Sequence, residues 1–190
     1  SVICTRIQRD ARTYPRKPFR ELSTMQLAAQ VGEHINELRA LGLQVIVFVD
    51  GGGVGGGVID RLRQLGHDAI EVNFGGKPDD PRKYVNKAAE MWDRVKGWLA
   101  TGYLPEDDEI IATDLTGREY GYNDASQIVM EKKEDMKKRG LASPDHADAL
   151  ALTFAHPAME LQSARSDAGA RGAHSQARPK HDPFTKDRLK

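Results

Sequence analysis

The sequence VIVFVDGGGVGGG, residues 45–57, is the stretch that decides the fold of this chain. Residues 43–49 form an almost continuous apolar run rich in β-branched side chains, a pattern typical of a strand covered on both faces. Asp50 follows that run, and six of the next seven residues are glycine. We therefore predict a central strand with a carboxylate at its carboxyl end, a favoured position for sites in α/β sheets.

The segments on either side of this strand predict an α/β core. Upstream, Ser23 and Gln26 form a capping box before a run of apolar residues at helical spacing. Downstream, residues 58–65 are typical of a short helix and residues 69–74 of another strand. This order of elements indicates parallel pairing through a right-handed crossover. Later, Asp80 predicts the start of an amphipathic helix, and residues 120–130 predict a hairpin.

The sequence SPDHADALALTFA, residues 143–155, predicts a last helix that begins with two carboxylates. Ser143 is expected as its N-cap and Pro144 as its first residue. Asp148 borders the apolar stripe of this helix, and a half-buried carboxylate there needs compensation, which a cation provides. Asp145 lies on the same face, although an acidic residue in a first turn also stabilises a helix through its dipole.

The glycine run is also compatible with a dinucleotide site, because Gly51, Gly53 and Gly56 match G-x-G-x-x-G between a strand and a helix. Asp50 argues against that site, since its charge would repel a pyrophosphate. A phosphate-binding P-loop is excluded because no G-K-[ST] follows the glycines. The pattern favours glycines that give a substrate close access to the carboxylate.

Composition narrows the class of protein without naming a partner. The 190 residues include 28 Lys and Arg and 28 Asp and Glu, so attraction to DNA has to be local. Five cations in the charged stretch EKKEDMKKRG before the predicted last helix are candidates for phosphate contacts, or else form a solvated helical face with interleaved acidic residues: Lys132, Lys133, Lys137, Lys138 and Arg139. A single cysteine excludes a disulfide. No apolar stretch approaches the ~20 residues that span a bilayer, which predicts an intracellular protein without a membrane partner.

Together these motifs resemble the nuclease domain of the large terminase subunit of tailed phages and prophages, a branch of the ribonuclease H-like nucleases. The resemblance runs from the start to about His156 and rests on the order of VIVFVDGGGVGGGVIDRL, NKAAEMWDRVKGWL, DLTGREYGY and MEKKEDMKKRGLASPDHADALALTFA. It implies a mixed sheet flanked by helices and an acidic cluster that binds two Mg²⁺ or Mn²⁺ ions. Asp50 and Asp148 match two family carboxylates, with Asp145 as a possible companion ligand.

The resemblance also implies a reaction and a setting. Two metal ions would activate water and stabilise the leaving 3′ oxygen during phosphodiester hydrolysis. The expected function is endonucleolytic cleavage of concatemeric phage DNA during genome packaging, in the cytoplasm of a bacterial host. The implied partners are double-stranded DNA, a terminase ATPase domain, the small terminase subunit and the portal.

One departure from the family leaves an alternative open. Family members carry a further metal-binding aspartate on a first strand, and residues 1–7 look like the strand after it, so residues 1–160 are expected to form an N-terminally incomplete nuclease domain. Asp10, the only nearby substitute, lies in a polar turn. The alternative is therefore a noncatalytic packaging or DNA-binding fragment with an incomplete metal site. Residues 161–190, with seven Lys and Arg against three Asp and Glu, are predicted to be a disordered basic tail.

Overall fold

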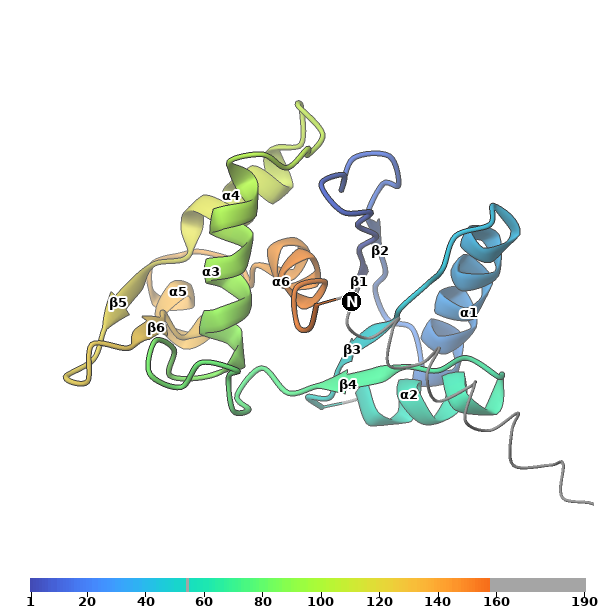
Figure 1. Cartoon of the computed structure of the whole chain (residues 1–190), viewed down its shortest axis with the longest axis horizontal. Helices are drawn as coiled ribbons and strands as arrows, with labels where there is room; N and C mark the ends of the chain where they lie inside the picture. The colour runs from blue at the N-terminus through green and yellow to red at the C-terminus, as the bar shows by residue number, and fades with distance from the viewer. Residues whose placement is uncertain (54, 158–190) are drawn as a thin grey trace, which may run out of the picture. The chain divides into compact units, whose positions relative to one another are not determined.

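The computed structural model describes residues 1–53 and 55–157, and contacts divide the chain into the units Ser1–Ala155 and His156–Lys190. The described residues form a mixed α/β fold with six helices and three two-stranded sheets (Figure 1). No helix among them is long and apolar enough to cross a membrane. The predicted tail at residues 161–190 lies outside the described residues, and the predicted domain boundary at 160 stays a prediction.

The glycine-rich motif forms a parallel β-α-β unit. Strand β3 (Phe48–Asp50) pairs in parallel with β4 (Ile70–Val72), and helix α2 (Gly55–Gln64) connects them. This confirms the predicted order and direction of the elements. The strand is shorter than predicted, because only the Val47 carbonyl in residues 43–47 takes part in pairing, where it accepts the Ile70 N–H at 2.8 Å.

Two apolar layers cover this strand, as its sequence predicted. Val45, Val47 and Val49 pack against a core formed by α2 and α1 (Thr24–Ala40). Phe48 points the other way, into a core that includes side chains of α3 (Lys87–Leu99) and α6 (Asp145–Leu152). The alternation follows from the period of two in an extended chain. It leaves Asp50 at the exposed end of a strand that contacts α6.

Helix α1 begins where the sequence predicted, whereas α3 does not. Ser23 caps α1 and Gln26 completes the capping box. The helix predicted from Asp80 begins only at Lys87, with Asn86 as its N-cap. Asp80 instead accepts the Arg82 N–H at 3.1 Å in a turn. The local signals around Asp80 were therefore those of a turn, and the helix prediction was wrong by about two turns.

The remaining described elements are two antiparallel strand pairs and two short helices. Strand β1 (Val2–Ile3) pairs with β2 (Lys17–Pro18), and the predicted hairpin is confirmed as β5 (Tyr120–Tyr122) with β6 (Ile128–Met130). Two short helices flank this hairpin, α4 (Glu109–Gly117) before it and α5 (Lys133–Lys138) after it. The sequence did not predict α4, because only Ile111 of its side chains is buried and its apolar pattern is weak.

Cys4 is a half-buried thiol with a raised pKa. Burial raises the pKa of the Cys4 thiol to about 11, against the opposing charges of Arg16 and Arg6. At pH 8 the folded protein then holds about a hundredth of the thiolate of an ordinary cysteine, and the thiolate is the nucleophile. We expect a thiol-specific reagent to react about 100-fold faster in 6 M guanidinium chloride than in buffer at pH 8. Equal rates would contradict the burial of this side chain.

Candidate metal centre

Asp50 is presented to solvent by a tight turn at the end of β3. Its Oδ1 accepts the Gly52 N–H at 3.0 Å, which folds the side chain back over the turn. A Cβ at Gly55 would overlap the Asp50 carbonyl oxygen, and Gly53 has φ +61°. The glycines therefore let the backbone turn sharply beside the carboxylate, where a side chain would not fit.

The first turn of α6 is held by another helix rather than by its own residues. Asp114, on α4, accepts the N–H groups of His146 at 2.9 Å and of Ala147 at 3.2 Å through its Oδ2. Pro144 occupies the N-cap position and makes no side-chain capping bond, so the prediction of Ser143 as N-cap was wrong. A carboxylate at a helix N-terminus also interacts favourably with the helix dipole. Asp114 therefore fixes the segment that carries Asp145 and Asp148.

Asp148 is the central acidic group of this region and is 8% exposed. Its Oδ1 accepts the indole N–H of Trp92 at 3.0 Å and a guanidinium N–H of Arg118 at 3.3 Å. Its Oδ2 lies 2.7 Å from the ammonium nitrogen of Lys133. Two cations thus compensate one buried carboxylate, as the cost of burying an isolated charge demands.

Arg118 is a member of this site that was not predicted from the sequence. Its side chain is 8% exposed, and the guanidinium carbon lies 5.0 Å from the ring centroid of Trp92. Burial lowers the pKa of Arg118, while the carboxylates of Asp148 and Glu131 oppose that shift. The contact joins residues 30 positions apart, so no local pattern could have revealed it.

Asp148 Oδ2, the oxygen beside Lys133, is suited to binding a cation. Asp148 Oδ2 is buried and has no hydrogen-bond donor, so the short contact with Lys133 is an ion pair without hydrogen-bond geometry. A buried carboxylate oxygen without a hydrogen-bond donor is a suitable ligand for a hard cation. In this structure the Lys133 ammonium supplies the positive charge beside that oxygen. Asp148 Oδ2 can therefore serve as one ligand of a divalent ion when the flexible Lys133 side chain, 43% exposed, moves away.

The other predicted ligands do not close a cluster around Asp148. Asp145 lies at the exposed start of α6, and Asp50 lies at the end of β3. Among residues 1–53 and 55–157, no group of three or more His, Cys, Asp and Glu side chains is placed to hold a metal ion. His146, between Asp145 and Asp148, contacts an arginine rather than a carboxylate. Its Nδ1 accepts the Nε–H of Arg16 at 3.3 Å.

The five cations predicted to contact phosphate fall into two groups. Lys132 and Lys137 are exposed on and beside α5. The other three pair with carboxylates: Lys133 with Asp148, Lys138 with Asp135 at 2.7 Å, and Arg139 with Glu131 at 2.6 Å. The exposed i, i+3 pair at Lys138 matches the alternative of a solvated helical face.

The fold is similar to that of a solved terminase nuclease domain. No protein-family model and no curated protein matches the sequence. Among solved structures, the nuclease domain of the large terminase subunit gp2 of bacterial virus Sf6 has a TM-score of 0.62 at 19% identity, covering 81% of this chain and 80% of that domain. A mutant of that domain with manganese has a TM-score of 0.63 at 18% identity and covers 81% and 82%. The same mutant with calcium has a TM-score of 0.63 at 18% identity and covers 81% of each chain.

Proposed function

We propose that this chain is a metal-dependent DNA endonuclease domain of the large terminase type, with a ribonuclease H-like arrangement of its core. The observation that carries the proposal is the buried Asp148 carboxylate, which has an oxygen without a hydrogen-bond donor and two cations beside it. The fold shared with nuclease domains solved with manganese and calcium supports the same conclusion. Asp50, at the end of a strand that contacts α6, supplies a second hard ligand.

The proposed ligands are Asp50 and Asp148, with Asp145 as an additional one, and the proposed ions are Mg²⁺ or Mn²⁺. Two such ions, when bound, would supply an activated water and neutralise charge on a phosphodiester. Trp92 and Arg118 hold one oxygen of Asp148, so the carboxylate has a fixed orientation before any ion arrives. With an ion bound at Asp148, the ammonium of Lys133 would be released from the carboxylate and could pair with a substrate phosphate.

The proposed substrate is double-stranded phage DNA in concatemeric form, cut during genome packaging in the bacterial cytoplasm. The proposed contacts to backbone phosphates come from the exposed Lys132 and Lys137, and such contacts would position DNA without reading its sequence. The proposed protein partners are the terminase ATPase domain, the small terminase subunit and the portal.

Nicking of supercoiled plasmid tests the proposal. We expect relaxed and linear products with Mg²⁺ or Mn²⁺ and no product when EDTA is in excess. The second candidate is a noncatalytic DNA-binding fragment, favoured by the lack of a three-ligand group among the described residues. Retarded migration of DNA in a gel without nicking, in either metal, would support that fragment and contradict the endonuclease.

Metal removal is expected to stop nicking and to lower the melting temperature only by the free energy of ion binding, so that the chain stays folded in EDTA. Arg118 and Lys133 already compensate the buried charge of Asp148, so the folded state does not depend on a bound ion for that compensation. The measurement is the melting temperature by circular dichroism, with and without EDTA, at a fixed Na⁺ concentration. A chain that is already unfolded in EDTA at 25 °C would show that folding requires the metal.

A further inference from the structure

The β5–β6 hairpin is anchored at the candidate metal centre by both of its ends. Arg118 precedes β5 and Lys133 follows β6, and both residues pair with Asp148. Successive side chains of an extended strand point to opposite sides, so positions 118, 120 and 122 share one side. Tyr120 and Tyr122 therefore continue the line that Arg118 begins, within about 13 Å along the strand at 3.3 Å per residue.

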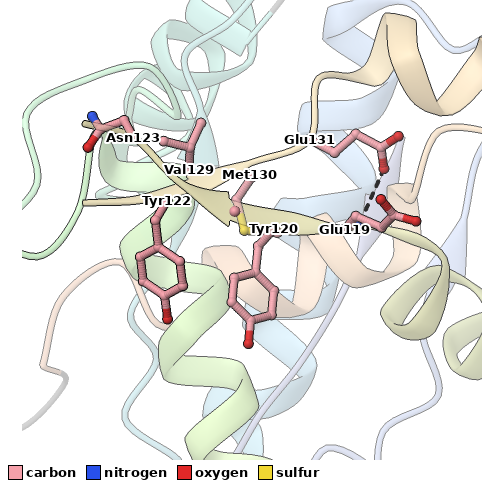
Figure 2. A pocket seen from close by; sticks show the side chains of 8 residues that line it. Glu119, Tyr120, Tyr122, Asn123, Val129, Met130 and Glu131 are labelled. Atoms are coloured by element: carbon pink, nitrogen blue, oxygen red, sulfur yellow. Dashed lines mark hydrogen bonds between the residues drawn. The ribbon is translucent and has the colours of Figure 1, made fainter. Parts of the chain in front are cut away.

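Both tyrosines on this line are open to solvent. Tyr120 is 49% and Tyr122 is 67% exposed, and their ring centroids lie 6.2 Å apart at an interplanar angle of 75°. Figure 2 shows the two phenol rings projecting side by side from the same face of the hairpin. They border a shallow hollow of about 470 Å³, which Val129 and Met130 also line. Exposed aromatic side chains that cluster in this way are typical of a surface that binds a partner.

Helix α3 supplies a cation to the same face. Lys96 donates to the Tyr120 hydroxyl at 2.9 Å, and its ammonium lies 4.6 Å from the centroid of that ring. Trp92, one helical turn earlier, contacts Arg118 in the same way. The line of ring and cation contacts thus runs from Asp148 outward along α3 and β5.

The two acidic residues that line the hollow, Glu119 and Glu131, share one arginine. Arg139 pairs with Glu131 at 2.6 Å and with Glu119 at 3.3 Å. Lys96 adds a positive charge beside the Tyr120 ring. An aromatic face with a neighbouring cation matches a nucleobase with its phosphate.

We propose that Tyr120, Tyr122 and Lys96, the tyrosine platform, bind unpaired bases of a DNA strand by stacking, with Lys96 contacting the phosphate. The inference rests on the proposed function, because it assigns a DNA contact to the same site. The platform takes single-stranded rather than duplex DNA, since stacking needs a base face that pairing and stacking within a duplex would hide. Strand ends or locally opened DNA beside Asp148 are thereby held in place.

Fluorescence anisotropy with a fluorescein-labelled 20-nucleotide oligothymidine, and with a duplex of the same length, tests the platform in EDTA so that no strand is cut. We expect the double variant Tyr120→Ala/Tyr122→Ala to bind the single strand about tenfold or more weakly, since each stacked base contributes appreciably. The matched Tyr120→Phe/Tyr122→Phe variant keeps both rings and is expected to bind within about twofold of the original chain. Duplex affinity is expected to change little in either variant.

Three outcomes would overturn the platform: no single-strand binding by the unmodified chain, equal single-strand affinity in both double variants, or loss of self-association as the only effect of the alanines. Circular dichroism melts of each variant separate these outcomes from unfolding. Plasmid nicking by the unmodified chain is measured independently. Tyrosine-dependent binding without nicking contradicts the endonuclease and leaves the platform standing, whereas nicking without tyrosine-dependent binding contradicts the platform alone.

Discussion

Replacing Asp148 with asparagine is expected to lower the rate of plasmid nicking by about 100-fold or more. The amide keeps the shape of the carboxylate but loses its charge, so the hard divalent ion loses a ligand that suits it. Asparagine also leaves Arg118 and Lys133 without the anion that compensates them. The measurement is the initial rate of plasmid nicking at saturating Mn²⁺, beside the melting temperature of the variant.

Asp50→Asn separates loss of catalysis from loss of folding. Asp50 is exposed and its only side-chain bond among the described residues is with the Gly52 N–H, which an amide oxygen also accepts. We expect a loss of nicking similar to that of Asp148→Asn with an unchanged melting temperature. Asp68→Asn, at another exposed aspartate, is the matched control and is expected to nick normally. Full activity in both site variants would contradict the metal assignment.

Replacing Glu90 with alanine is expected to lower the free energy of unfolding by about 3–5 kcal/mol. The Glu90 side chain is 2% exposed and accepts from Lys87 Nζ at 2.9 Å, Arg94 at 2.9 Å and the Asp79 N–H at 2.9 Å. Its removal leaves Lys87, 5% exposed, with Asp79 as its remaining anion. Such a loss is a large share of the ~5–15 kcal/mol that stabilises an ordinary domain.

Urea denaturation, followed by tryptophan fluorescence, measures this effect. The double variant Lys87→Met/Glu90→Leu removes both buried charges and is expected to recover most of the loss, because an apolar pair of similar volume avoids the unpaired ion. Glu33→Ala, at an exposed position of α1, is the control and is expected to fall within about 0.5 kcal/mol of the original chain. A Glu90→Ala variant as stable as that control would contradict the ion-pair network.

Short-range signals account for the parts of the fold that the sequence predicted. The capping box at Ser23 and Gln26 defines the start of α1 because both bonds lie within four residues. The alternation of Val47, Phe48 and Val49 predicts a strand covered on two faces, and the two cores confirm it. Likewise, Asp148 was selected because it borders the apolar stripe of its helix, and it is buried there.

Contacts between distant segments account for what the sequence could not give. The start of α3 is bonded to an earlier segment: the Lys87 N–H donates to the Gly76 carbonyl at 2.9 Å and the Ala88 N–H to the Phe74 carbonyl at 2.8 Å. Similarly, the partners of Asp148 come from α3, from the C-cap of α4 and from α5. Lys133 was predicted as a phosphate contact, because only the folded chain brings its ammonium next to a carboxylate.

The Asp114 cap of α6 has a consequence for how this region can evolve or be engineered. The orientation of the helix that carries Asp145 and Asp148 depends on a side chain of α4, more than 30 positions earlier. Residues 143–155 alone are therefore not a transferable part. Grafting them into another scaffold would carry the carboxylates without the group that aims them, so α4 and α6 are expected to be exchanged between chains as one inherited unit.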